Sequence, residues 1–142
     1  MSTVIDIADA VVARLNAGSF SQQFTAERKY QPVFGLPDLG TLRVSVVPRS
    51  VSIEGGTRTA SFFDCAIDVG VQKKVNPDQP AEVDGLMDLV EEIADHLRMQ
   101  RLAEAPEAAW LSIANEPVFA PEHLDQERTF TSVLTVRYRV RR

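Results

Sequence analysis

The stretch from Thr59 to Lys73 carries the strongest structural signal in the chain, a two-residue alternation of apolar and polar side chains. One set of alternate positions is apolar, namely Phe63, Cys65, Ile67, Val69 and Val71, while the other set includes Asp64, Asp68 and Gln72. Because successive side chains of a strand point to opposite faces, this pattern predicts a β-strand with one buried and one solvated face. Other elements of the chain must cover the buried face.

Two stretches have the three- and four-residue spacing of amphipathic helices and can supply that cover. The first runs from about Thr3 to Ala17, and its apolar stripe consists of Val4, Ile5, Ala8, Val11, Val12 and Leu15. The second runs from about Glu82 to Arg101, and its stripe consists of Val83, Leu86, Leu89, Val90, Ile93 and Leu97. Acidic residues early in this second helix, with Arg98 and Arg101 late, suit the helix dipole.

Four further strands are predicted from shorter apolar patterns, at about Phe24–Tyr30, Leu42–Val46, Ala109–Ile113 and Arg128–Val140. Pro48 is expected to close the second of these. The polar stretch Arg49–Arg58, which contains Gly55 and Gly56, then reads as a flexible hairpin connection. It and the long segment from Gly18 to Gly40 are expected to order against neighbouring subunits.

The order of these elements predicts the fold class α+β. We expect a mainly antiparallel sheet of about four to five strands, with the two amphipathic helices packed together on one face. The length of 142 residues suits a single domain, 1–142.

Composition excludes several classes of function. The net charge of -5 argues against a general nucleic-acid binder, since such proteins need a cationic surface to displace phosphate counterions. The single cysteine, Cys65, provides neither an intrachain disulfide nor a zinc cluster. The sequence contains no run of about 18 apolar residues and no basic leader at its start. We therefore expect a protein that lies outside the membrane, in the cytosol.

Three groups of residues have side chains that can do chemistry, and each also has a structural interpretation. His96 shares a helical face with Glu92 and lies beside Asp95, a spacing that fits an acid–base or metal pair as well as a surface pair; His123 is too far away in sequence to join them. The polar-face pair Asp64 and Asp68 suits acid–base work or a divalent cation, but also a solvated face or subunit contact.

The thiol of Cys65 alternates with apolar neighbours, so we interpret it as a small core residue rather than a nucleophile. Since no phosphate loop, dinucleotide motif or hydrolase elbow occurs, we expect no enzyme activity, no cofactor, no metal and no small-molecule substrate.

Arginines form the one local exception to the acidic balance, with Arg137, Arg139, Arg141 and Arg142 close together at the end of the chain. Such a cluster can meet phosphates or, as we prefer, the carboxylates of an acidic protein surface. Our candidate residues for subunit or partner contact are Arg49, Arg58, Arg137 and Arg139.

In the order and pattern of its predicted elements, the whole chain resembles the tail terminator, or tail-completion, proteins of long-tailed bacteriophages. The segments that carry this likeness are VIDIADAVVARLNAG, FTAERKYQPVF, LRVSVVPRS, FDCAIDVGVQKK, AEVDGLMDLVEEIADHLR and NEPVFAPEHLDQERTFTSVLTVRYRVRR. The likeness is one of element order, without a catalytic motif, and it transfers no functional residue position by position.

The resemblance implies a virion structural protein of the tail and neck that is present in the host cytoplasm during assembly. It implies a homo-oligomeric ring, a hexamer, which caps the tail tube, stops tube polymerisation and offers a surface to the head-completion or connector protein. Alternatives are another neck, head-tail adaptor or tail protein, a small α+β enzyme, and a non-catalytic regulatory binding module.

Overall fold

The computed structural model describes residues 3–30, 42–76, 78–116, 119, 121–122 and 128–142. The elements in chain order are α1 (Thr3–Ala17), β1 (Ala26–Arg28), β2 (Arg43–Gly55), β3 (Ser61–Lys74), α2 (Pro80–Leu97), β4 (Ala109–Asn115) and β5 (Thr129–Arg141). The predicted excursion between Gly18 and Gly40 lies outside the described residues from position 31 onward. None of the described helices is both long enough and apolar enough to cross a membrane.

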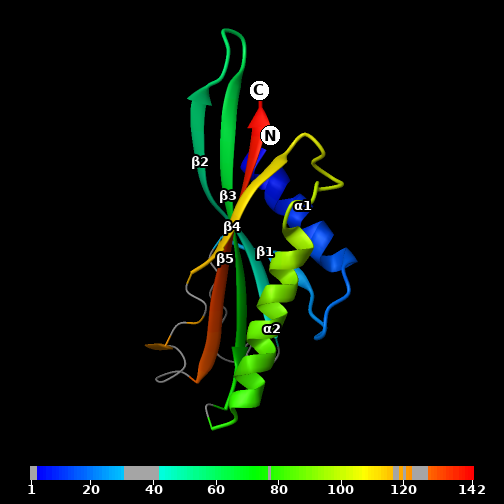
Figure 1. The fold of residues 1–142 in the computed structure, drawn as a ribbon, viewed down its shortest axis with the longest axis vertical. Helices are drawn as coiled ribbons and strands as arrows, with labels where there is room; N and C mark the ends of the chain where they lie inside the picture. Colours follow the sequence, from blue (N-terminus) through cyan, green and yellow to red (C-terminus); the bar gives the residue numbers. More distant parts are fainter. Residues whose placement is uncertain (1–2, 31–41, 77, 117–118, 120, 123–127) are drawn as a thin grey trace.

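The strands form one five-stranded sheet in the order β1-β2-β3-β5-β4. The short strand β1 runs parallel to β2, and every other neighbouring pair is antiparallel. Both helices pack against the sheet on the same side (Figure 1). The predicted fold class, an α+β fold with a mainly antiparallel sheet, is therefore confirmed.

The alternation in β3 decides which face the helices cover. Cys65, Ile67, Val69 and Val71 are completely buried, and they lie in one core cluster with the apolar stripes of α1 and α2. The helices contribute the following fully or almost fully buried residues: Ile7, Val11 and Leu15 from α1, and Leu86, Leu89, Ile93 and Leu97 from α2. Each such side chain stabilises the fold by roughly 1.5–3 kcal/mol relative to exposure.

Helix α2 begins two residues earlier and ends four residues earlier than the sequence predicts. Pro80 occupies the first turn, where proline is tolerated because the missing N–H would have no helical partner. At the other end Arg98 is extended, and Met99 has a φ of 57° in the left-handed region, so the chain leaves the helix there. Arg98 and Arg101 consequently follow the helix rather than belong to it.

The predicted end of strand β2 at Pro48 is wrong, and so is the flexible connection at Arg49–Arg58. The strand continues to Gly55, and only residues 56–60 connect it to β3. The register shifts between Pro48 and Ser50, so that Arg49 is an extra residue, a β-bulge.

The bulge explains the wrong prediction, because it changes the phase of the alternation. Val44 and Val46 lie opposite Val71 and Val69 of β3, whereas Val51 and Ile53, at odd positions, lie opposite Cys65 and Phe63. All of these β3 residues point to the helix side. A search with an unbroken period of two therefore loses the strand at Arg49.

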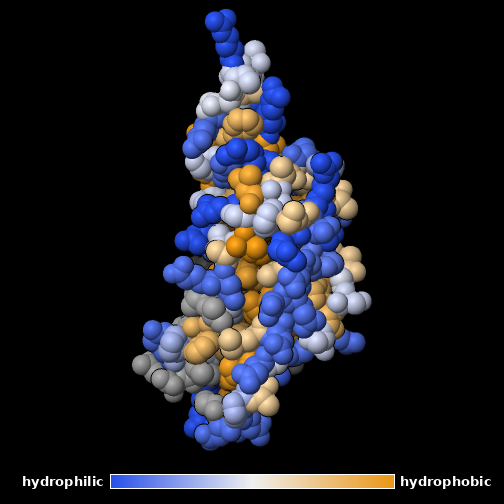
Figure 2. Space-filling model, viewed as in Figure 1, coloured by the Kyte–Doolittle hydropathy of each residue, from blue (hydrophilic) through white to orange (hydrophobic). Residues whose placement is uncertain are grey.

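The hairpin of β2 and β3 extends beyond the helix layer (Figure 1). Its tip closes with Gly56 N and Thr57 N donating to the Ala60 carbonyl, at 3.2 and 3.0 Å. On its stem Val51 and Ile53 are 41% and 60% exposed. Apolar surface is visible among polar side chains on the upper part of the molecule, below the polar tip (Figure 2). The sheet thus leaves part of its apolar face uncovered.

Candidate functional site

The imidazole and carboxylate predicted to share a face of α2 connect this helix to α1 and to the segment that follows it. Glu92 accepts hydrogen bonds from the backbone N–H and the hydroxyl of Ser21. His96 Nε2 lies 3.0 Å from the Arg14 carbonyl, and because a carbonyl oxygen only accepts, this nitrogen carries the proton. Arg14 returns a bond from Nε to the His96 carbonyl at 3.0 Å.

These contacts give Glu92 and His96 a structural role. The ring of Phe20 meets His96 edge-on, with ring centroids 5.2 Å apart. Asp95 instead pairs with Arg98 at 3.4 Å. His123 lies outside the described residues. Within the described parts of the chain, no group of three or more His, Cys, Asp or Glu side chains could hold a metal ion.

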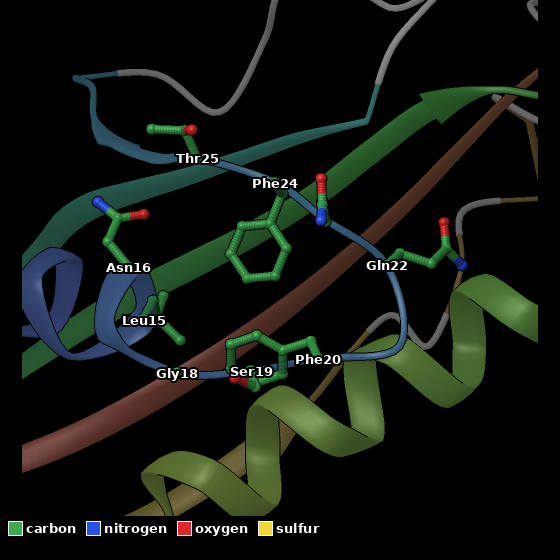
Figure 3. A pocket seen from close by; sticks show the side chains of 9 residues that line it. Leu15, Asn16, Gly18, Ser19, Phe20, Gln22, Phe24 and Thr25 are labelled. Atoms are coloured by element: carbon green, nitrogen blue, oxygen red, sulfur yellow. The ribbon is translucent and has the colours of Figure 1, made fainter.

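A hollow of about 520 Å³ lies between the end of α1 and the start of β1 (Figure 3). Its lining consists of Leu15, Asn16, Gly18, Ser19, Phe20, Gln22, Gln23, Phe24 and Thr25. Asn16 is fixed there by two bonds to the backbone of Ala26, one donated at 3.1 Å and one accepted at 2.8 Å. Since the lining offers amides, hydroxyls and two phenyl rings but no acid, base or cation, we do not assign chemistry to it.

The thiol of Cys65 is completely buried in the core. Burial, with a smaller contribution from the charge of Asp64, raises the pKa of this thiol above its usual value. Only the thiolate is a strong nucleophile, so Cys65 acts as a packing residue.

The two carboxylates on the other face of β3 are neutralised by cross-strand partners. Arg139 donates to both oxygens of Asp64, from Nε at 2.7 Å and from Nη2 at 2.9 Å. Asp68 accepts a bond of 2.7 Å from the Thr135 hydroxyl and lies 3.5 Å from Arg49 Nη1. Each carboxylate thus holds neighbouring strands in register.

The structure brings three of the four predicted contact arginines to this polar face. Arg49 and Arg137 line a hollow of about 420 Å³ together with Ser112, Ala114, Glu116 and Thr135. Arg139 is held by Asp64 and covers the ring of Phe62 at 4.8 Å. Arg58, in contrast, is exposed in the hairpin tip and lies apart from the others.

The features that the sequence interpretation missed are the two free edges of the sheet. On one side, β1 pairs with β2 only at Val44–Val46, so the rest of β2 is an outer strand among the described residues. On the other side β4 is the outermost strand. Of the five large hydrophobic residues that are exposed among the described parts of the chain, four lie at these edges: Val51 and Ile53 on β2, Leu111 on β4, and Met99, which follows α2 and lies beside the start of β4.

Strand β4 lacks the charges that usually protect an outer strand, whereas the free part of β2 has Pro48, Arg49 and Glu54 on either side of the uncharged run Ser50–Ile53. Native proteins place Lys, other charges or Pro on exposed strands, because unpaired backbone groups otherwise recruit further strands. Strand β4 reads AWLSIAN and contains no charged residue, and β2 contains none from Ser50 to Ile53. Beside β4 lies a hollow of about 300 Å³ lined by Met99, Gln100, Arg101, Ala108, Ala109 and Trp110. The exposed apolar residues at both edges, together with the uncharged strand β4, make the two edges the best candidate for an interaction site.

A scan against models of known protein families found no match for this chain, and a search of curated proteins found no similar sequence. The functional argument therefore depends on the geometry of the molecule.

The contact of Gly18 with α2 generates the first prediction. A Cβ added at Gly18 would lie 2.9 Å from both His96 Nε2 and the ring of Phe20. Because neither neighbour can move without losing its packing, we expect Gly18→Ala to lower the free energy of unfolding by about 1–3 kcal/mol in urea denaturation. Gly55→Ala is the matched control, since an added Cβ there meets nothing within 4 Å. An equal effect of the two substitutions would contradict the role given to His96.

The ion pair of Asp64 and Arg139 generates the second prediction. Hydrogen bonding to Arg139 lowers the pKa of the Asp64 carboxyl below its usual value. A depressed pKa stabilises the fold above the unfolded-state value of about 3.9, and this stability is lost as the pH falls through the lowered pKa. We therefore expect Asp64→Asn to be less stable than wild type at pH 7 and to lose less stability between about pH 4 and pH 2.

Denaturation midpoints measured across this pH range test the prediction. Asp88→Asn, on the exposed surface of α2, serves as the control and should follow the wild-type curve. If Asp64→Asn kept the full acid sensitivity of wild type, the ion pair would not be a source of stability.

Proposed function

We propose that this chain is a non-catalytic structural subunit that associates with copies of itself into a ring, in the manner of a phage tail terminator. The ring would cap the tail tube, stop its polymerisation and join the tail to the head-completion or connector protein. It would act in the virion tail and neck, after assembly in the host cytoplasm.

One observation carries the proposed self-association: the stem of the hairpin extends beyond the helix layer, and Val51 and Ile53 are exposed there on the free edge of β2. Full burial of such a side chain from water is worth roughly 1.5–3 kcal/mol, and Val51 and Ile53, which are 41% and 60% exposed, would gain about half of this on being covered. Neighbouring apolar side chains that are exposed together can mark a surface that a protein partner covers.

The ring is favoured over a simple two-fold dimer by the difference between the edges. A dimer with two-fold symmetry uses the same patch on both copies, whereas unlike patches give a head-to-tail contact that closes into a ring or continues as a filament. The free part of β2 and strand β4 are unlike patches on opposite sides of one sheet.

The roles of the reactive side chains support a non-catalytic subunit. Glu92 holds the segment after α1, and His96 is bonded to Arg14 at the end of α1. Asp64 and Asp68 hold neighbouring strands, and Cys65 lies in the core. Their hydrogen bonds are already made within the fold, so none of these groups is poised toward a substrate.

The tail terminator role itself comes from the resemblance of the sequence segments described above. Within the same class of function, the alternative is another neck, head-tail adaptor or tail protein. A regulatory binding module is the alternative outside that class. The two experiments below separate these roles.

The first experiment measures mass in solution by light scattering. We expect the wild-type chain to be a multimer of defined mass and the double variant Val51→Glu, Ile53→Glu to be a monomer, because two buried charges in the contact would be strongly unfavourable. Ala81→Glu is the control, since residue 81 is exposed in the first turn of α2, where an acid is tolerated. A wild-type monomer at high concentration would refute self-association.

The second experiment uses electron microscopy of a tail-tube protein polymerised with and without this chain. A terminator is expected to give rings bound at one end of the tubes and a shorter mean tube length. Rings that never bind tube ends would favour another ring of the neck. A protein that forms no ring would favour the binding module.

A further inference from the structure

We propose that the free edge of β2 pairs, antiparallel and in a fixed register, with strand β4 of a second copy, so that Val51 lies opposite the second copy's Trp110. This inference depends on the proposed self-association and names the surfaces that make it.

The two free edges lie at the same level of the sheet. Residues paired from β2 through β3 and β5 to β4 form a row that crosses the sheet from one edge to the other. Three of these rows are Ser52–Asp64–Arg139–Ala109, Val51–Cys65–Tyr138–Trp110 and Val47–Asp68–Thr135–Ala114. The free part of β2 begins after Val46, and β4 spans the rows from Val46 to Ser52. Copies related by rotation about an axis parallel to the strands, without translation, would therefore bring the two edges together.

The directions of the edge strands also suit this pairing. β2 is antiparallel to β3, β3 to β5, and β5 to β4, so β2 and β4 of one copy run in opposite directions. The same rotation then places β2 of one copy antiparallel to β4 of the next. Antiparallel pairing is the slightly more stable arrangement per residue.

The β-bulges of the two edge strands lie in the same row of the sheet. Arg49 is the extra residue of β2 opposite Ala66, and Leu111 is the extra residue of β4 opposite Arg137. Ala66 and Arg137 are themselves partners, so both bulges fall in the same row. When the edges meet at one level, two residues face two residues and the register stays continuous on both sides of the bulge. A shift by even one row would set each bulge against a regular segment.

The apolar side chains of the two edges lie on the same side of the sheet. Val51 and Ile53 lie on the helix side of the sheet, in the rows of Cys65 and Phe63, and Trp110 also lies on that side, in the row of Tyr138. The hollow of about 300 Å³ beside Trp110 includes Met99, which is 73% exposed. The exposed side chains of one edge thus meet the apolar hollow of the other, and the contact covers both.

Pro48 sets a limit to the ladder. It lies in the row of Ile67, Val136 and Ile113 and has no N–H to donate. The contact therefore has its backbone hydrogen bonds chiefly above this row, near Val51 and Trp110, where the apolar side chains also meet.

The experiment is disulfide trapping of the predicted neighbours. Ser52 and Ala109 share a row, point to the polar face and are both exposed, so the pairing places their Cα atoms within disulfide range. Ser52→Cys with Ala109→Cys in one chain should give a ladder of linked multimers on a non-reducing gel. An equal mixture of the two single variants should give linked dimers, and each single variant alone should give neither.

The matched control is Ser52→Cys with Ala114→Cys. Ala114 lies on the same strand, points to the same face and is also exposed, but it is about 14 Å along the strand from the row of Ser52. The control should stay unlinked. The native Cys65 does not interfere, since it is completely buried.

Light scattering of every reduced variant accompanies the gels. If the variants are multimers but Ser52 and Ala109 do not link, or link no better than the control, this pairing is wrong while the proposed ring subunit stands. If the wild-type chain is a monomer, both the pairing and the proposed function fall.

Discussion

Strand β3 is the constraint on which the rest of the structure depends. Its residues pair with β2 on one side and with β5 on the other over almost its whole length. Being internal, it must present one apolar face to the core while its other face carries Asp64, Ala66, Asp68, Gly70 and Gln72. The two helices cover the apolar face, and ion pairs with neighbouring strands neutralise the carboxylates on the polar face.

The length of this strand produces the uncovered surface. At about 3.4 Å per residue, the 14 residues of β3 span roughly 47 Å, whereas the 18 residues of α2 span roughly 27 Å at 1.5 Å each. The hairpin therefore extends past the helix layer, as Figure 1 shows. Its stem keeps the alternation of a buried strand, with Val51 and Ile53 turned to the side where a helix would lie. The uncovered apolar surface is thus a direct result of a sheet that is longer than the helices that cover it.

The strongest elements could be predicted from sequence because their patterns are local and unbroken. The alternation of β3 and the stripes of both helices depend on one period each, and the structure has these three elements within a few residues of the predicted bounds, the largest difference being the earlier end of α2. The extension of β2 could not be predicted from one period, because the bulge at Arg49 changes the phase. Val51 and Ile53 nevertheless alternate with Ser50, Ser52 and Glu54, and this was the available signal.

The candidate site was less predictable because it depends on contacts distant in sequence. The i,i+4 spacing correctly places Glu92 and His96 on one side of α2, but their partners Ser21 and Arg14 lie 71 and 82 residues away. Similarly, the sequence shows that β2 and β4 are strands but not that they are the outer ones. That fact follows only from the pairing order of the sheet.

The most direct test of the paired edges is the fluorescence of Trp110, the single tryptophan of the chain. Emission spectra and light scattering are recorded together over a dilution series. If the edges pair as described, the emission of Trp110 shifts to longer wavelength over the same concentration range in which the mass falls, because the indole loses the cover of Val51. An emission maximum that stays constant while the multimer dissociates would contradict the account.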